Sequence, residues 1–126
     1  MTGTTLDAGA LIALEAGSAR MRALVSRALE HGAPVSIPAG ALAQSWRGSA
    51  RQARIARLLR STVTEVVPLD QRAALAVGKL CAHTSASDVV DVSVVLCARE
   101  RGHPVVTSDP GDLHAVDPGL QILSPG

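Results

Sequence analysis

The stretch "DVVDVSVVLCARERGHPVVTSD", residues 88–109, combines a valine-rich segment with aspartates. Valine favours strands, and buried aspartate is rare unless it is paired or holds a metal. Asp88 and Asp91 are three residues apart, so a helix would place both on one face and the valines on the others. The segment continues into alanine and arginine and ends at "GHP", which is a helix stop. It therefore predicts a helix, then a buried strand at "PVVT", and then Asp109.

Short apolar segments and helical segments alternate along the rest of the chain. Strands are expected at residues 4–6, 34–38, 63–69, 104–109 and 120–125. Helices are expected from about residue 10 onward, and over 18–32, 39–48, 49–62, 70–83 and 88–102. Such alternation favours an α/β fold in which helices cover both faces of a parallel sheet. Strands that are apolar on both sides are typical of buried parallel strands.

The composition indicates one globular domain spanning residues 1–126. Hydrophobic residues make up 47% of the chain and charged residues 18%, which excludes a disordered chain. With one tryptophan and no phenylalanine or tyrosine, the protein could not hold single-stranded nucleic acid mainly by aromatic stacking. The start of the sequence lacks a signal-peptide pattern, and no apolar run approaches the ~20 residues of a membrane span. We therefore expect a cytoplasmic protein with no membrane partner, in which Cys81 and Cys97 are reduced thiols.

Aspartates stand where two of the expected strands end. Asp7 directly follows the first strand, Asp109 follows "VVTS", and Asp91 begins the helix that leads to that strand. If the two strands are neighbours in the sheet, their ends lie about 5 Å apart, at the edge where such sheets place their sites. Carboxylates that close would repel one another, and a divalent cation removes that cost. Oxygen ligands select Mg²⁺ or Mn²⁺, which can polarise a phosphodiester and activate water.

Each acid also has an ordinary structural interpretation. Asp7 and Asp88 are suited to capping helices, and Asp91 then falls in a first helical turn, where an acid suits the helix dipole. Asp109 can be a turn residue before a proline, and Asp112 can cap a helical turn. The joint arrangement is therefore more informative than any single aspartate.

Several segments resemble the motifs of PIN-domain proteins, in particular the VapC-type toxins of bacterial toxin–antitoxin pairs. These segments are "LDAGALIALE", "IPAGALAQSWRG" and "VVDVSVVLCARERGHPVVTSDPGDL", and the resemblance covers essentially the whole chain in order. It implies a three-layer α/β/α sandwich with a central parallel sheet. It also implies a Mg²⁺- or Mn²⁺-dependent ribonuclease, a cognate antitoxin that inhibits it, and a homodimer.

The resemblance also assigns site residues. The catalytic, metal-binding acids that it implies are Asp7, Asp91 and Asp109, with Asp88, Asp112 and Gln44 as further candidate ligands. Many members of the family carry a glutamate where this chain has Gln44, in "LAQSWR". The amide can still contact a metal or its water, but one negative charge is lost. The alternative to a ribonuclease is therefore a PIN-fold protein that binds RNA or an antitoxin and cleaves weakly or not at all.

Arginines are concentrated between residues 47 and 60. Arg47, Arg51, Arg54 and Arg57 are predicted to contact the RNA backbone, because guanidinium groups pair with phosphates in a fork. A solvated helix face is the competing interpretation, and in the family this region also borders the antitoxin groove. Trp46 is expected in the core or lining a groove.

Other chemistries are disfavoured. The four histidines show no ligand spacing, and no serine or cysteine has an evident histidine partner for covalent hydrolysis. A phosphate-transfer receiver or phosphatase would need an acid pair at the first strand or a lysine at a later strand end. This chain has one acid at the first strand, and Lys79 lies within an expected helix.

Overall fold

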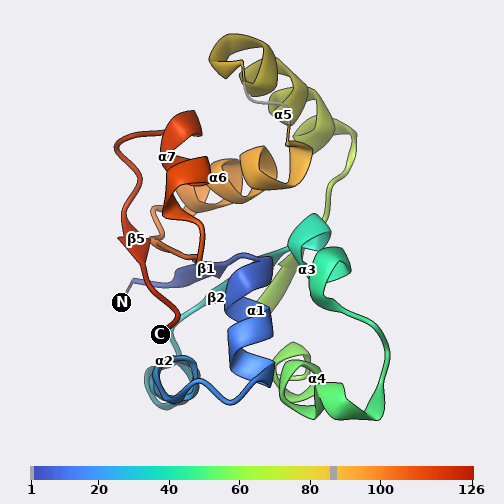
Figure 1. Ribbon diagram of the computed structural model, residues 1–126, viewed down its shortest axis with the longest axis vertical. Coiled ribbons are helices and arrows are strands. Elements are labelled where there is room, and N and C mark those ends of the chain that lie inside the picture. The colour runs from blue at the N-terminus through green and yellow to red at the C-terminus, as the bar shows by residue number, and fades with distance from the viewer. Residues whose placement is uncertain (1, 86–87) are drawn as a thin grey trace.

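A parallel sheet runs through the centre of the molecule. The computed structural model describes residues 2–85 and 88–126, and in this part of the chain the sheet has five strands in the order β3-β2-β1-β4-β5 (Figure 1). The strands are β1 (Thr4–Leu6), β2 (Val35–Pro38), β3 (Thr64–Val67), β4 (Val105–Val106) and β5 (Ile122–Leu123). β1 pairs in parallel with β2 on one side and with β4 on the other. The predicted parallel sheet is confirmed, and the two strands followed by Asp7 and Asp109 are neighbours.

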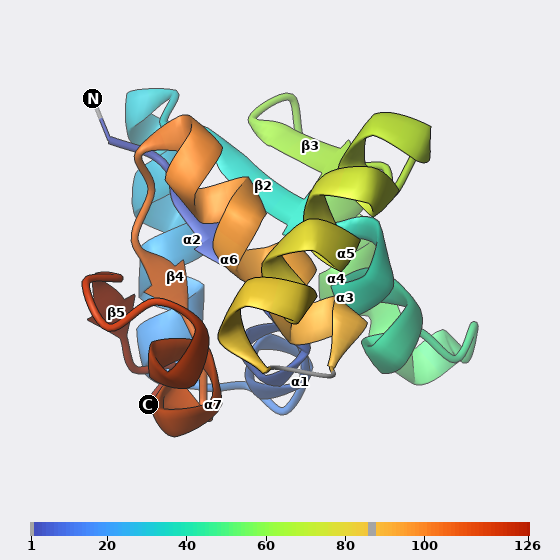
Figure 2. The ribbon, with the colours of Figure 1, turned by 90° about the horizontal axis from the view of Figure 1, so that it is seen from above.

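Helices cover both faces of this sheet. They are α1 (Ala8–Glu15), α2 (Ala19–His31), α3 (Ala39–Ser45), the 3₁₀ turn η1 (Ala50–Gln52), α4 (Ala53–Leu59), α5 (Gln71–Thr84), α6 (Val89–Arg101) and α7 (Pro110–Val116). Helices α1, α2 and α4 lie on one face, and α6 and α7 lie on the other (Figures 1 and 2). Helix α5 packs on the outer side of α6. The three-layer α/β/α sandwich is therefore confirmed.

Each face of the sheet has its own hydrophobic core. The first contains Leu6, Leu11, Ile37 and Val106 among its buried residues, and the second is built on the valines of α6 together with Val105. Adjacent residues of β4 thus serve opposite cores, as side chains that alternate along a strand must. The valines of "VVDVSVVL" are buried because α6 is covered by the sheet on one side and by α5 and α7 on others.

Capping residues begin and end the helices where the sequence predicted. The Asp70 side chain accepts a hydrogen bond from Ala73 N at 2.9 Å and begins α5, and Ser18 accepts one from Met21 N and begins α2. Helices α2 and α6 end at Gly32 and Gly102, whose φ angles of 65° and 67° are left-handed. Glycine adopts this conformation without strain.

Two predictions of local structure need correction. The helix expected over residues 49–62 is shorter and divided, because Ser49 caps the 3₁₀ turn η1 and the α-helical part starts only at Ala53. Helix α7 was not predicted, since "DPGD" has the composition of a turn. Trp46 is also outside the core: it ends α3 with 37% of its surface exposed.

Within the described residues, no single helix is long and apolar enough to cross a membrane. Helices α5 and α6 satisfy such a test by length and composition only when they are taken together, and they meet at an angle of 107°.

Candidate active site

The acidic residues gather at the carboxyl ends of β1 and β4. Asp7 follows β1 directly, and its N–H donates to the carbonyl of Val106, the last residue of β4, at 3.2 Å. Asp109 follows β4 after a two-residue connection and stands at the start of α7. The register that pairs Leu6 with Val106 therefore places these two acids at one edge of the sheet, as the sequence predicted.

Asp7 is both a helix cap and a perturbed acid. Its Oδ1 accepts a hydrogen bond from Ala10 N at 2.9 Å and so begins α1. Burial raises the pKa of Asp7, hydrogen bonds from the Thr107 hydroxyl and from Ala10 N partly offset this, and the negative charge of Asp109 raises it further. The capping interpretation and the site interpretation of Asp7 are therefore compatible, because capping uses one carboxylate oxygen.

A glycine lets the two strand ends approach each other. A Cβ atom added to Gly9, in the first turn of α1, would collide with the hydroxyl of Ser108 in the loop between β4 and α7. The absence of a side chain at Gly9 thus allows the loop that carries Asp109 to lie directly against the helix that Asp7 begins. This role of Gly9 was not predicted, although "LDAG" places glycine, a poor helix former, in the first turn of a helix.

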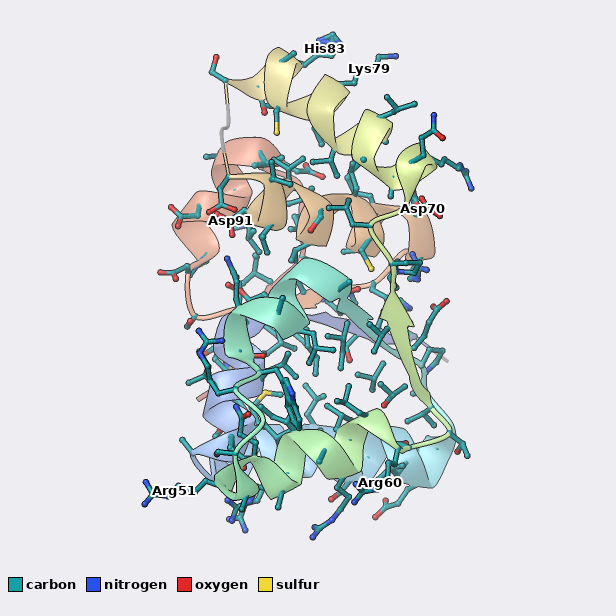
Figure 3. All side chains as sticks on the ribbon, turned by 90° about the vertical axis from the view of Figure 1, so that its right-hand side faces the viewer. Arg51, Arg60, Asp70, Lys79, His83 and Asp91 are labelled. Atoms are coloured by element: carbon teal, nitrogen blue, oxygen red, sulfur yellow. The ribbon has the colours of Figure 1, made fainter. Side chains whose placement is uncertain are left out.

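Asp88 and Asp91 lie at the start of α6. Asp88 is the N-cap and its Oδ1 accepts a hydrogen bond from Asp91 N at 3.0 Å. The pKa of Asp91 is raised to about 6, mainly by burial and then by the negative charges of Asp88, Asp112, Asp7 and Asp109. That one carboxylate is affected by four others shows that α1, α6 and α7 direct their first residues toward a common region. Figure 3 shows Asp91 at the upper left, at the start of α6.

Helix α7 supplies the remaining acids. Asp109 is at its N-cap position without a side-chain capping bond, and Asp112 lies in its first turn. Proline at the first helical position, followed by an acid in the first turn, is a helix-start signal that the sequence contains in "DPGD". Asp109 N donates instead to the Thr107 hydroxyl at 2.9 Å, which leaves its carboxylate without a capping role.

Gln44 lies on α3, near the start of α6. Gly40, one helical turn earlier on the same side of α3, packs against Val90: a Cβ atom there would lie 3.1 Å from the valine Cγ2. Gln44 itself is exposed. Residues four apart share a helix face, so Gln44 is on the side of α3 that borders the acidic edge.

The donor set suits a hard divalent cation, but the side chains do not form a closed cage. Among the residues that the structure describes, no three histidine, cysteine, aspartate or glutamate side chains converge closely enough to hold a metal ion. The available donors are carboxylate oxygens, which Mg²⁺ and Mn²⁺ prefer. Neighbouring carboxylates that raise the pKa of Asp7 and Asp91 are the electrostatic environment that a cation would relieve. Mg²⁺ usually retains several waters and needs few protein ligands, so the residues present fit such an ion.

The arginine segment, which we define as residues 47–60, lies on the face of the sheet opposite to the second core. The Arg47 Nη1 donates to the carbonyls of Ala43 and Trp46, and Arg51 belongs to η1 rather than to the same α-helix as Arg54 and Arg57. Across residues 2–85 and 88–126, none of these four arginines forms an ion pair. Figure 3 shows Arg51 at the lower left and Asp91 at the upper left, so the two residues lie toward opposite ends of the molecule in this view.

Two of these arginines line a groove between α2 and α4, which we call the α2–α4 groove. Its volume is about 240 Å³, and its apolar floor includes Leu14, Val25, Leu29 and Leu58. Its basic residues are Arg22, Arg54 and Arg57. Leu29 is 50% exposed, so the groove presents both apolar surface and positive charge.

Glu15 is a contact residue that the sequence analysis missed. It is the last residue of α1, and its Oε2 accepts hydrogen bonds from the backbone N–H groups of Arg54 and Ile55, at 3.0 and 3.1 Å. These residues are 39 and 40 positions apart in the chain, so no local pattern predicts the contact.

Cys81 and Cys97 are free thiols, as predicted. Cys97 is buried, and burial raises the pKa of its thiol. Its neighbour Thr5 also hydrogen-bonds the Nδ1 of His103, at 3.2 Å. His103 thus has a structural role in a buried hydrogen bond with Thr5, away from the acidic edge.

Comparison with known proteins identifies the family. The family model for the PIN domain matches residues 4–117, whereas no curated protein sequence matches. Three solved structures have the same fold. VapC20 of Mycobacterium tuberculosis, a toxin that cleaves the sarcin–ricin loop, is 21% identical with a TM-score of 0.64, and the match covers 94% of this chain and 96% of that one.

The other two structures are complexes. FitAB bound to an IR36 DNA fragment is 17% identical with a TM-score of 0.64, over 97% of this chain and 94% of that one. FitAcB from Neisseria gonorrhoeae is 18% identical with a TM-score of 0.65, over 97% of both chains. These likenesses establish the fold, and the family model accounts for nearly the whole sequence, acidic edge included. The chain belongs to the PIN domain family.

Proposed function

We propose that this protein is a divalent-metal-dependent endoribonuclease that acts as the toxin of a toxin–antitoxin pair. The observation that carries the proposal is the convergence of acids at one sheet edge, where four carboxylates help to raise the pKa of Asp91 to about 6. The sequence-related family and the VapC20 structure, whose protein cleaves RNA, support the same reaction.

In this proposal Asp7, Asp91 and Asp109 hold Mg²⁺ or Mn²⁺, with Asp88 and Asp112 contributing from the same helix starts. When bound, the cation supplies polarisation of the phosphodiester and activation of water. The capping bonds at Asp7 and Asp88 fix the orientation of these side chains before the cation arrives, which lowers the entropy lost on binding.

The direct test is RNA cleavage by the purified protein with Mg²⁺, Mn²⁺ or EDTA, compared with Asp91→Asn. We expect cleavage with either cation and loss of at least about a hundredfold in the variant, a typical effect of removing a catalytic group. The matched control is Asp70→Asn, which changes an aspartate at the N-cap of α5 on the other side of the molecule. Asparagine caps helices as well as aspartate, so this control should stay active. An active Asp91→Asn protein would refute the assignment of the site.

The same proposal assigns RNA binding to Arg47, Arg51, Arg54 and Arg57. Their charges are not neutralised by ion pairs within the described chain. Changing Arg51 and Arg54 together to glutamate should weaken RNA binding similarly for all sequences and reduce its salt dependence. An unchanged salt slope would mean that these arginines do not contact phosphates.

The partner in this proposal is an antitoxin bound in the α2–α4 groove. FitAB and FitAcB support a protein partner, and the groove offers apolar surface flanked by Arg22, Arg54 and Arg57. An amphipathic helix with acidic edges has complementary chemistry. Leu29→Glu should leave the protein toxic in cells yet prevent rescue by a small DNA-binding protein encoded beside it. Continued rescue would place the antitoxin elsewhere.

We also propose a homodimer and a cytoplasmic location. Leu75 on the outer side of α5 is 68% exposed and Leu69 is 43% exposed, and such apolar surface suits a second copy. Leu75→Glu should convert a dimer to a monomer in sedimentation velocity. The free thiols and an RNA substrate fit a reducing, RNA-containing compartment.

A second function is favoured by Gln44. With an amide in place of the family's glutamate, the protein could bind RNA or its antitoxin and cleave weakly or not at all. This alternative predicts tight RNA binding without cleavage at any Mg²⁺ or Mn²⁺ concentration, together with equal binding by Asp7→Asn.

A further inference from the structure

Glu15 connects two parts of the molecule that are remote in sequence. Its Oε2 accepts the N–H groups of Arg54 and Ile55, the donors that an N-capping side chain would normally satisfy. The residue at the N-cap of α4, Gln52, makes no such bond and instead donates to the Ser45 carbonyl at 2.7 Å. The start of α4 is therefore capped from outside, by the end of α1.

The contact is reciprocal. The Arg54 Nη1 donates to the backbone carbonyl of Glu15 at 3.1 Å, while the Glu15 carboxylate receives the Arg54 backbone N–H. The guanidinium group of Arg54 uses one of its several N–H donors in this bond and keeps the rest. The Glu15 side chain therefore fixes the start of the helix that carries Arg54. The Arg54 side chain bonds the backbone of Glu15 rather than its carboxylate, so this contact does not neutralise its charge through an ion pair.

Helix α1 connects the Glu15 contact with the acidic edge. Asp7 caps its first turn and Glu15 is its last residue. Its eight residues span about 12 Å, and Ala10, Leu11 and Leu14 anchor it in the first core. One buried helix thus carries a site acid at one end and the attachment of the arginine segment at the other.

We propose that Glu15 is a positioning residue for RNA: it holds the arginine segment, Arg54 above all, at a fixed place relative to Asp7. The inference rests on the proposed ribonuclease function. Residues 47–51 are exposed, and they are held from the start of α4, because the Gln52 Oε1 accepts the backbone N–H groups of Arg47 and Gly48 at 2.7 and 3.0 Å. Ile55 and Leu58 anchor the buried side of α4, and Glu15 sets how its first turn is oriented.

The direction in which RNA affinity changes on replacing Glu15 distinguishes a positioning role from a purely electrostatic one. Removing an acid beside a phosphate-binding surface should tighten RNA binding if only electrostatics matter. If Glu15 positions Arg54, its removal should weaken binding despite that gain. The decisive variants are Glu15→Ala, Glu15→Gln, which loses the charge but keeps an acceptor oxygen, and Glu15→Asp, which keeps the charge but is too short to reach.

The experiment measures the Kd of the full-length protein for a short single-stranded RNA of mixed sequence in EDTA, over a range of salt concentrations. Cleavage kinetics with Mn²⁺ are measured in parallel. We expect Glu15→Ala and Glu15→Asp to raise Kd and KM about fivefold while kcat stays within about twofold, since the cap that orients the first turn of α4, and with it Arg54, is lost. Glu15→Gln should stay within about twofold of the wild type. Glu30→Ala, at an exposed acid of α2, is the control for charge and should bind equally or more tightly.

Arg54→Ala separates this inference from the proposed function. If Arg54→Ala weakens binding but Glu15→Ala and Glu15→Asp do not, the positioning role is wrong and the RNA surface stands. If Arg54→Ala also binds normally, the arginine surface of the proposed function is wrong and the inference falls with it. Should Glu15→Ala fail to fold, Glu15→Asp alone decides, because it differs from the wild type by a single methylene.

Discussion

Asp91 is an acid whose ionisation opposes folding at neutral pH. Its pKa is about 6 in the folded protein, compared with an ordinary value of 3.8. A raised acid pKa means that the ionised group destabilises the fold above that pKa and that stability is regained as pH falls from about 6 toward 4. A two-unit shift corresponds to about 3 kcal/mol, which solvent screening of this partly exposed group reduces to about 1 kcal/mol.

Asp91→Asn should therefore abolish cleavage and raise the thermal stability of the metal-free protein. We expect a gain of about 1 kcal/mol above pH 7 that disappears near pH 4, because the wild-type carboxylate is then protonated. Thermal unfolding in EDTA across this pH range measures it, with Asp70→Asn as the control that should show no gain. A destabilised Asp91→Asn protein would mean that the favourable helix-dipole interaction of Asp91 outweighs repulsion.

Gln44 is the one candidate metal ligand of the proposed site that carries no charge. If it borders the site, Gln44→Glu should tighten Mn²⁺ or Mg²⁺ binding and leave the fold intact, because the two side chains are nearly isosteric. Cleavage need not increase. Titration calorimetry on both proteins at one pH provides the comparison, and equal affinities would place Gln44 outside the coordination sphere.

At the scale of elements, α1 meets the loop before α7 at Gly9, where an added Cβ atom would lie 3.2 Å from the Ser108 Cβ and closer still to its hydroxyl. Gly9→Ala should lower both stability and activity, because a Cβ atom there would collide with Ser108. Gly78→Ala is the matched control: Gly78 lies within α5 with no atom within 4 Å of an added Cβ, so alanine should stabilise it by up to about 1 kcal/mol. If thermal unfolding shows that Gly9→Ala lowers stability and Gly78→Ala raises it, the close approach of Ser108 to Gly9 is supported. Two stabilised proteins would contradict it.

The elements that the sequence predicted well are those governed by local chemistry. Asp70, Asp88 and Ser18 begin helices, and the apolar strands are buried as expected. Helix α7 was missed because proline and glycine in "DPGD" favour a turn and a helix start alike. The cap that Glu15 supplies to α4 could not be predicted, since it depends on how α1 and α4 pack, and Glu15 and Arg54 are 39 positions apart in the chain.

At the scale of the whole molecule, the candidate site exists only when three helices and two strands are assembled. Asp7, Asp91 and Asp109 come from the starts of α1, α6 and α7, so their convergence depends on the strand order that makes β1 and β4 neighbours. The sequence suggested the candidate acids, and it predicted that Asp7 and Asp109 lie close together on the condition that their two strands are neighbours, as the strand order makes them. The sequence could not indicate how closely the carboxylates approach one another. Among the described residues they lie near one another without forming a closed metal site.

A cation should therefore stabilise the whole fold. Binding only to the assembled site adds stability in proportion to the logarithm of the cation concentration. Mn²⁺ should raise the melting temperature of the wild type, less so below about pH 6, where Asp91 is protonated. Asp91→Asn should respond weakly. An equal rise in both proteins would indicate that Mn²⁺ binds elsewhere.

The double use of Asp7 and Asp88 as helix caps constrains how this protein could lose its activity over evolutionary time. A lineage released from selection for cleavage could replace Asp112 with almost any residue. At positions 7 and 88 a random replacement would also uncap a helix, so asparagine, serine or threonine should be the substitutions that persist. Under the proposed toxin function, decayed copies of such a gene should therefore encode well-folded, inactive proteins that still bind the proposed antitoxin.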